Sequence, residues 1–216
     1  MRFADRADAG RRLAEALRHY RDRDPVVLAL PRGGVPVAAE IAAALSAPLD
    51  VLLARKIGVP SQPELAMGAV VDGAEPIVVR NPEVIRLAHV DARAFEAAAA
   101  RALVEVERAR RRLVGQRPRV EVAGRAAILV DDGVATGATA RAALQALRLK
   151  VPRTLTLAVP VASAEALAAL EREVDDLVCL ERPASFLAVS AFYRDFRQVE
   201  DAEVVAILMR FPPAAA

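Results

Sequence analysis

The sequence predicts an α/β fold, with a mostly parallel sheet covered by helices on both faces. Short apolar runs recur along the chain without polar alternation, as in strands that are buried on both faces. From residue 125 onward these runs alternate with helical patterns, which is typical of a parallel sheet. The 216 residues suffice for one such domain, and no linker or internal repeat divides them. We therefore expect a single domain over residues 1–216.

The first part of the chain predicts two helices and two buried strands. Apolar residues recur at helical spacing over residues 8–20, and a continuous apolar run over residues 26–30 indicates a buried strand. Residues 31–34 break this strand, and a second helical pattern follows over residues 35–45. The apolar run over residues 49–54 predicts the second strand.

The middle of the chain is less regular. Residues 55–69 contain two prolines and two glycines without a clear period, which predicts a long loop, and loops of that length are uncommon unless they are functional or disordered. Residues 70–79 predict a short hairpin around Asp72 and Gly73. Asp91 then caps a long helix that reaches about Val114.

The long helix has an apolar seam and an arginine-rich surface. Apolar residues follow one another at steps of four and three from Phe95 to Leu113. The arginines of the other faces could contact phosphate or RNA, but glutamates interleave with them and favour a solvated surface. These arginines are Arg101, Arg108, Arg110, Arg111 and Arg112.

The last part of the chain alternates strands and helices. We expect strands at residues 126–131, 154–159 and 176–180, and helices at residues 137–148, 163–173 and 201–210.

Composition and charge exclude several classes of protein. The net charge of +2 is too small to predict affinity for nucleic acid or for membranes. No apolar run approaches the roughly 18 residues that span a bilayer, and the first residues lack the apolar core of a signal peptide, so we expect a cytoplasmic protein. The single cysteine, Cys179, lies in an apolar run and is expected to be a buried core thiol. His19 and His89 are given no catalytic role.

Residues 128–139 form the most informative motif, in which a buried strand runs into two acids, a loop of small residues and a helix. Gly133 and Gly137 let the backbone approach a ligand closely, and the free N–H groups of a helix N-terminus bind anions. The carboxylates of Asp131 and Asp132 would repel that anion, but they accept hydrogen bonds from vicinal hydroxyls or hold Mg²⁺ through water. A ribose 5-phosphate has phosphate and diol at the required separation. The motif is neither a P-loop nor a dinucleotide fingerprint.

The motif resembles the signature of the type I phosphoribosyltransferases, which bind 5-phosphoribosyl-1-pyrophosphate (PRPP). Residues 31–34 are similar to the pyrophosphate loop of that family, and residues 55–67 stand where its mobile loop closes over PRPP. Residues 183–195 resemble a bacterial subgroup whose acceptor is unassigned. The resemblance implies the family's α/β fold, with a mobile loop and small hairpin or hood elements.

The resemblance also assigns the candidate site residues. Asp131 and Asp132 would bind the ribose hydroxyls and, indirectly, Mg²⁺. The 5-phosphate would be bound by Gly133, Ala135, Thr136, Gly137, Ala138 and Thr139. Pyrophosphate would be bound by Pro31, Arg32, Gly33 and Gly34, with Arg55 and Lys56 as catalytic cations of the mobile loop.

The implied reaction is Mg²⁺-dependent transfer of phosphoribose from PRPP to a nitrogenous acceptor, with a nucleobase as the expected acceptor. Three points stay open. Glu64 could act as a base or only cap local N–H groups, and Phe192 and Tyr193 could stack on the acceptor, although core packing is favoured. The alternatives to a transferase are a non-catalytic PRPP sensor and a hydrolase of PRPP or of another phosphate ester. Similar proteins are commonly homodimers.

Overall fold

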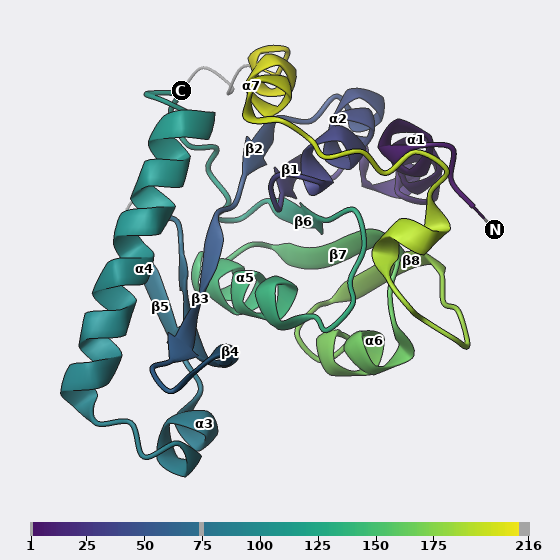
Figure 1. Ribbon diagram of the computed structural model, residues 1–216. Coiled ribbons are helices and arrows are strands. Elements are labelled where there is room, and N and C mark those ends of the chain that lie inside the picture. The colour runs from purple at the N-terminus through teal and green to yellow at the C-terminus, as the bar shows by residue number, and fades with distance from the viewer. Residues whose placement is uncertain (1, 74–75, 212–216) are drawn as a thin grey trace.

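Five parallel strands form the central sheet of the computed structural model, which describes residues 2–73 and 76–211 (Figure 1). The strands are β1 (Pro25–Ala29), β2 (Leu49–Val51), β6 (Ala126–Val130), β7 (Thr154–Val161) and β8 (Asp176–Glu181). Their order in the sheet is β2-β1-β6-β7-β8, and every neighbouring pair is parallel. The predicted fold class is therefore confirmed.

Helices cover both faces of this sheet because successive side chains of a strand point to opposite sides. Val27 of β1 packs with Leu13 and Ile41, whereas the neighbouring Val26 packs with Leu144 and other residues of a second cluster. One face is covered by α1 (Arg6–Ala16) and α2 (Gly34–Leu45), and the other by α5 (Ala138–Leu149) and α6 (Ala164–Leu170), as Figure 1 shows. The 3-10 turns η1 (Arg18–Tyr20) and η2 (Val189–Phe192) and helix α7 (Asp201–Met209) complete this part.

A second sheet corrects the predicted long loop over residues 55–69. Strands β3 (Ala54–Val59), β4 (Gln62–Val71) and β5 (Ile77–Arg80) form an antiparallel sheet in that order. The prolines and glycines belong to a hairpin, since Pro60 lies in its turn and Gly58 lies at a shift in the strand register. A Cβ atom at Gly58 would lie 2.4 Å from the carbonyl oxygen of Pro63, so only glycine fits there. The hairpin predicted over residues 70–79 is confirmed as the β4–β5 pair.

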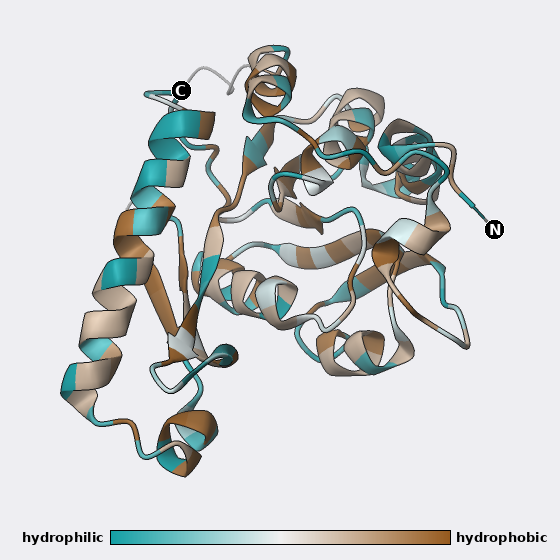
Figure 2. Ribbon diagram, in the orientation of Figure 1, coloured by the Kyte–Doolittle hydropathy of each residue, from teal (hydrophilic) through white to brown (hydrophobic). Residues whose placement is uncertain are grey.

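Helix α4 (Ala92–Leu113) packs against the second sheet (Figure 1). Its predicted apolar seam is confirmed, because Phe95, Ala102 and Val106 are buried. Hydrophilic and hydrophobic residues alternate along this helix in Figure 2. Asp91 caps it as expected, with its carboxylate accepting a hydrogen bond from the Ala94 N–H at 2.7 Å. The short helix α3 (Pro82–Leu87) before it was not predicted.

Two smaller findings complete the comparison with the sequence. Cys179 lies on β8 and is half-buried instead of fully buried, and this partial burial raises the pKa of its thiol. Among the described residues, no helix is both long and apolar enough to cross a membrane.

Candidate functional site

The acid pair and the predicted pyrophosphate loop lie side by side at the carboxyl edge of the central sheet. Asp131 and Asp132 follow β6, and residues 31–34 follow β1, its neighbour in the sheet. The two segments are in direct contact, because a Cβ atom at Gly33 would lie 1.9 Å from Oδ2 of Asp132. One at Gly34 would lie 2.8 Å from the carbonyl oxygen of Val130. The peptide bond between Pro31 and Arg32 is cis.

Burial perturbs both carboxyl groups. The pKa of Asp131 is raised well above its ordinary value of 3.8, first by loss of solvent and then by the neighbouring charge of Asp132. Burial also raises the pKa of Asp132, although the hydrogen bond from Arg6 opposes this rise. The backbone N–H of Asp132 donates to Oδ1 of Asp131 at 2.8 Å. Ligand hydroxyls or a cation at this point would stabilise the ionised pair.

Arg6 and Tyr193 form hydrogen bonds with Asp132, and the sequence placed neither of them beside the acid pair. Nε of Arg6 donates to Oδ2 of Asp132 at 2.8 Å, and the Arg6 guanidinium lies 3.9 Å from the centre of the Phe196 ring. The Tyr193 hydroxyl donates to the main-chain oxygen of Asp132 at 2.5 Å. Tyr193 is buried against Phe3 and Phe196, which supports core packing over acceptor stacking.

The loop after the acid pair leads into the N-terminus of α5, as the motif predicts. Gly137 immediately precedes the helix with a φ of +77°, a left-handed conformation that favours glycine. A hydrogen bond fixes this loop to the residue before α6, since the Ser163 hydroxyl donates to the main-chain oxygen of Ala135 at 2.6 Å. Thr136 and Thr139 are exposed beside the free N–H groups of the helix. Phosphate oxygens fit this arrangement of donors.

Each predicted cation is paired with a carboxylate. Arg55 Nε lies 2.6 Å from Glu105 of α4, and Lys56 Nζ lies 2.6 Å from Glu64. The hydrogen bond from Lys56 lowers the pKa of Glu64. On the pyrophosphate loop, Nη1 of Arg32 lies 3.5 Å from Asp201 of α7. Arg55 and Lys56 belong to β3, so both sit on a strand and not on the predicted loop.

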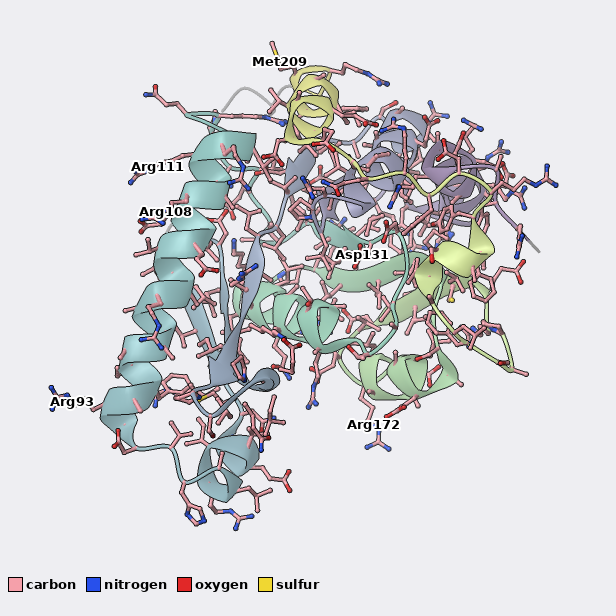
Figure 3. All side chains as sticks on the ribbon, viewed as in Figure 1. Arg93, Arg108, Arg111, Asp131, Arg172 and Met209 are labelled. Atoms are coloured by element: carbon pink, nitrogen blue, oxygen red, sulfur yellow. The ribbon has the colours of Figure 1, made fainter. Side chains whose placement is uncertain are left out.

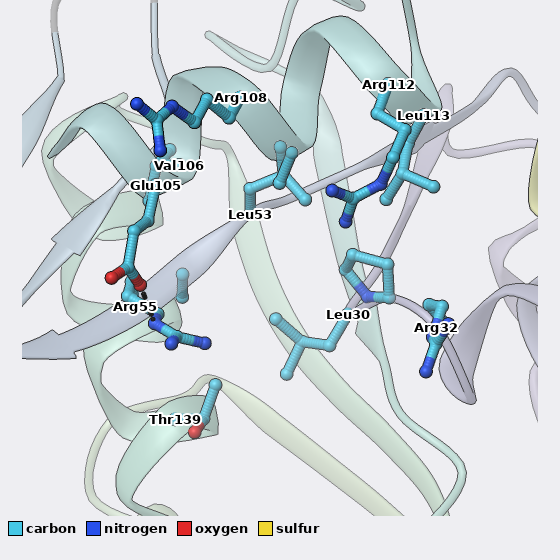
Figure 4. Close-up of a pocket in the computed structure, with 13 residues that line it drawn as sticks. Leu30, Arg32, Leu53, Arg55, Glu105, Val106, Arg108, Arg112, Leu113 and Thr139 are labelled. Carbon is cyan, nitrogen blue, oxygen red and sulfur yellow. Dashed lines mark ion pairs between the residues drawn. The ribbon is translucent and has the colours of Figure 1, made fainter. Parts of the chain in front are cut away.

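Two adjoining cavities lie between these cations and α4. Their volumes are about 510 Å³ and 540 Å³, and Arg55, Glu105 and Thr139 line both of them. Arg32 also lines the first cavity (Figure 4) and Lys56 lines the second. Figure 3 shows Asp131 near the centre of the molecule, while Arg108 and Arg111 lie along α4. The cavities therefore join the start of α5, the pyrophosphate loop and β3.

The fold brings the acid pair, residues 31–34 and the N-terminus of α5 together at the carboxyl edge of a parallel sheet, and their donors and acceptors are chemically suited to a phosphorylated, hydroxyl-bearing ligand. Residues 4–197 match the family described as the phosphoribosyl transferase domain, so the chain belongs to this family. The family is named for transfer of a phosphoribosyl group, which is a pentosyltransferase reaction.

The curated relatives carry the name of this family, and two solved structures share the fold. A Mycobacterium tuberculosis protein named "Putative phosphoribosyl transferase" is 49% identical over 208 residues, which are 96% of this chain and 46% of that protein. The chain thus spans about half the length of the curated relatives it matches. TT1426 from Thermus thermophilus has a crystal structure with 46% identity and a TM-score of 0.86, covering 98% of this chain and 100% of that one. A Neisseria gonorrhoeae protein with bound ppGpp shares the fold at 14% identity and a TM-score of 0.50, covering 97% and 98%.

Proposed function

We propose that the chain transfers the 5-phosphoribosyl group of PRPP to a nitrogenous acceptor and releases pyrophosphate. One observation carries the proposal: the segment with Arg32, the acid pair and the N-terminus of α5 meet at one edge of the sheet. This proximity supports a site in which one ligand spans all three. Asp131 and Asp132 would accept the ribose hydroxyls, residues 133–139 would bind the 5-phosphate, and Arg32 would bind pyrophosphate.

The proposed step exchanges one bond at C1 of the ribose. The C1–O bond to pyrophosphate breaks and its electron pair leaves with pyrophosphate, while the lone pair of the acceptor nitrogen forms the C1–N bond. The proton on that nitrogen is released to a base or to water. Arg32, Arg55 and Lys56 would stabilise the negative charge on pyrophosphate. The buried carboxylates would favour positive charge on the ribose.

The chemistry of the donors fits a Mg²⁺ ion that is shared with the substrate. Among the residues described by the structure, no three or more His, Cys, Asp or Glu side chains could together hold a metal. Mg²⁺ is commonly bound by one or two carboxylates together with substrate phosphates, so Asp131 and Asp132 would hold it only with PRPP present. When bound, the ion would neutralise charge on the leaving pyrophosphate.

Ligand-dependent stabilisation tests the binding half of this proposal. At about 100 times its dissociation constant, Mg²⁺-PRPP should stabilise the fold by roughly 2.7 kcal/mol, which raises Tm by several degrees at this chain length. The variant with Asp131→Asn and Asp132→Asn should lose this shift. Asp22→Asn, an exposed residue before β1 at the opposite edge of the sheet, is the control. Wild-type stabilisation of the double variant would refute the role of the acid pair.

Pyrophosphate release tests the catalytic half. We expect release only when Mg²⁺-PRPP and a suitable acceptor are both present. Release without any acceptor would instead identify a hydrolase. Binding of Mg²⁺-PRPP without release across a panel of nitrogenous acceptors would identify a sensor.

A further inference from the structure

One stripe of α4 carries four charged side chains that line the two cavities. Arg101, Glu105, Arg108 and Arg112 follow one another at steps of four, three and four residues, which places them on one face of the helix. All four line a cavity, and Glu105 lines both. The arginines were expected to form a solvated surface, whereas three of them flank the proposed active site.

Most charges around the cavities are paired, but two arginines of the stripe are not. Glu105 pairs with Arg55, and Asp201 of α7 pairs with both Arg32 and Arg112. Arg101 and Arg108 form no ion pair or hydrogen bond with any residue that the structure describes. Two guanidinium groups on the cavity walls are therefore available to a ligand.

The remaining walls are aliphatic. Leu53, Val106 and Leu113 line the first cavity, and Ala98 and Ala102 line the second. No aromatic side chain of the described residues lines either one, so the site has no ring on which a planar base could stack. Guanidinium groups recognise carboxylate and phosphate oxygens through paired hydrogen bonds. Recognition in these cavities is thus better suited to an anion than to a neutral base.

We propose that the acceptor carries an anionic group, a carboxylate or a phosphate ester, and that Arg101 and Arg108 bind it. This inference rests on the proposed function, in which Arg32, Arg55 and Lys56 serve the pyrophosphate. Arg101 and Arg108 lie on the wall that α4 forms, and the pyrophosphate does not require them. The aliphatic residues between them would contact the uncharged part of the acceptor.

Matched pairs of small molecules test the proposal in the presence of saturating Mg²⁺-PRPP. The pairs are pyridine-3-carboxylate with its carboxamide, 2,4-dioxopyrimidine-6-carboxylate with 2,4-dioxopyrimidine, and 2-aminoethyl phosphate with 2-aminoethanol. Pyrophosphate release and thermal stabilisation are measured for each. We expect the anionic member of at least one pair to act and its neutral partner to be inactive. The pair that responds distinguishes carboxylate from phosphate.

A charge-matched control separates the cavity from the general field of α4. The variant with Arg101→Gln and Arg108→Gln should bind the active probe roughly tenfold or more weakly, a loss of about 1.4 kcal/mol or more. Its stabilisation by Mg²⁺-PRPP should persist. The control carries Arg93→Gln and Arg111→Gln on the same helix, and neither of these residues lines a cavity.

Three outcomes would overturn the inference: neutral members act as well as anionic ones, no anionic member acts, or the cavity variant behaves like the control. Failure of the proposed function looks different, since Mg²⁺-PRPP alone would then leave the Tm of the wild-type chain unchanged.

Discussion

At the scale of single residues, Arg6 is the ion-pair partner of Asp132. Its hydrogen bond at 2.8 Å lowers the pKa of a carboxyl group that burial otherwise raises. Arg6→Ala should weaken Mg²⁺-PRPP binding roughly tenfold or more, because hydrogen bonds to charged groups contribute about 1.5–3 kcal/mol. Isothermal titration calorimetry measures the change. Arg11→Ala, on an exposed part of the same helix, is the control, and unchanged affinity in Arg6→Ala would contradict the role given to the guanidinium.

Gly33 offers a second test at this scale. The Cβ atom of Gly33→Ala would lie 1.9 Å from Oδ2 and 2.5 Å from Cγ of Asp132, so either the loop or the carboxylate must move. We expect the thermal shift with Mg²⁺-PRPP to shrink or vanish. In Gly115→Ala the added atom meets nothing within 4 Å, and the left-handed φ of +62° alone should cost about 1–2 kcal/mol of stability without reducing that shift. If Mg²⁺-PRPP raised the Tm of both variants equally, the close contact of Gly33 with Asp132 would not be required for ligand binding.

The sequence predicts part of this residue-level arrangement. Asp131, Asp132 and the loop up to Thr139 are contiguous, so their shared location follows from a strand that ends before a helix. Arg6 lies 126 residues before Asp132, and it is one of many arginines with nothing in its local sequence to mark it. Its contact depends on how α1 packs, which local periodicity does not encode. Tyr193 belongs to residues 183–195, which resemble a bacterial subgroup of the family, but this resemblance does not predict its hydrogen bond to Asp132.

At the scale of elements, the β3–β4 hairpin presents Lys56 next to Glu64. The lowered pKa of Glu64 makes this exposed carboxylate a weak base. We therefore expect Glu64→Gln to retain turnover, whereas Lys56→Gln should weaken Mg²⁺-PRPP binding by about tenfold through loss of a charged donor. Steady-state pyrophosphate release and calorimetry separate the two effects. A loss of turnover in Glu64→Gln at unchanged PRPP affinity would instead support the predicted catalytic role of Glu64.

The β3–β4 hairpin could not be predicted from local sequence patterns. Its prolines and glycines predict a loop because they interrupt every local period, yet they occupy a turn and a register shift inside a sheet. By contrast, α4 has a long seam and an N-cap at Asp91, and two independent local signals predict its ends to within a residue. The cavity-facing stripe of α4 could not be predicted, since it depends on which side of the helix meets β3.

At the scale of the whole molecule, buried charges tie the second sheet to the rest of the fold. Asp72, just after β4, accepts from Arg110 of α4 at 2.7 Å and from Arg119 at 2.6 Å. Asp72 and Arg110 are 6% and 8% exposed, so neither charge has water as an alternative partner. The parallel sheet could be predicted because its strands are continuous apolar runs. The ion pair between Asp72 and Arg110 could not, since the two residues lie 38 positions apart and no local pattern connects them.

Removing one partner of this cluster should therefore destabilise the whole molecule. Asp72→Asn leaves the buried Arg110 guanidinium without a carboxylate, for which the expected cost is about 3–5 kcal/mol. Arg110→Met should cost less, because Asp72 keeps its ion pair with Arg119. The double variant should lose less than the sum of the two single variants, because it removes both charges together. Urea denaturation measures the free energy of unfolding of the wild-type chain, the two single variants and the double variant.

Since Arg110 lies on the helix that carries Arg108 and Arg112, the single variants should also bind the acceptor probes less tightly. Strict additivity of the two losses would show that Asp72 and Arg110 stabilise the fold independently of each other.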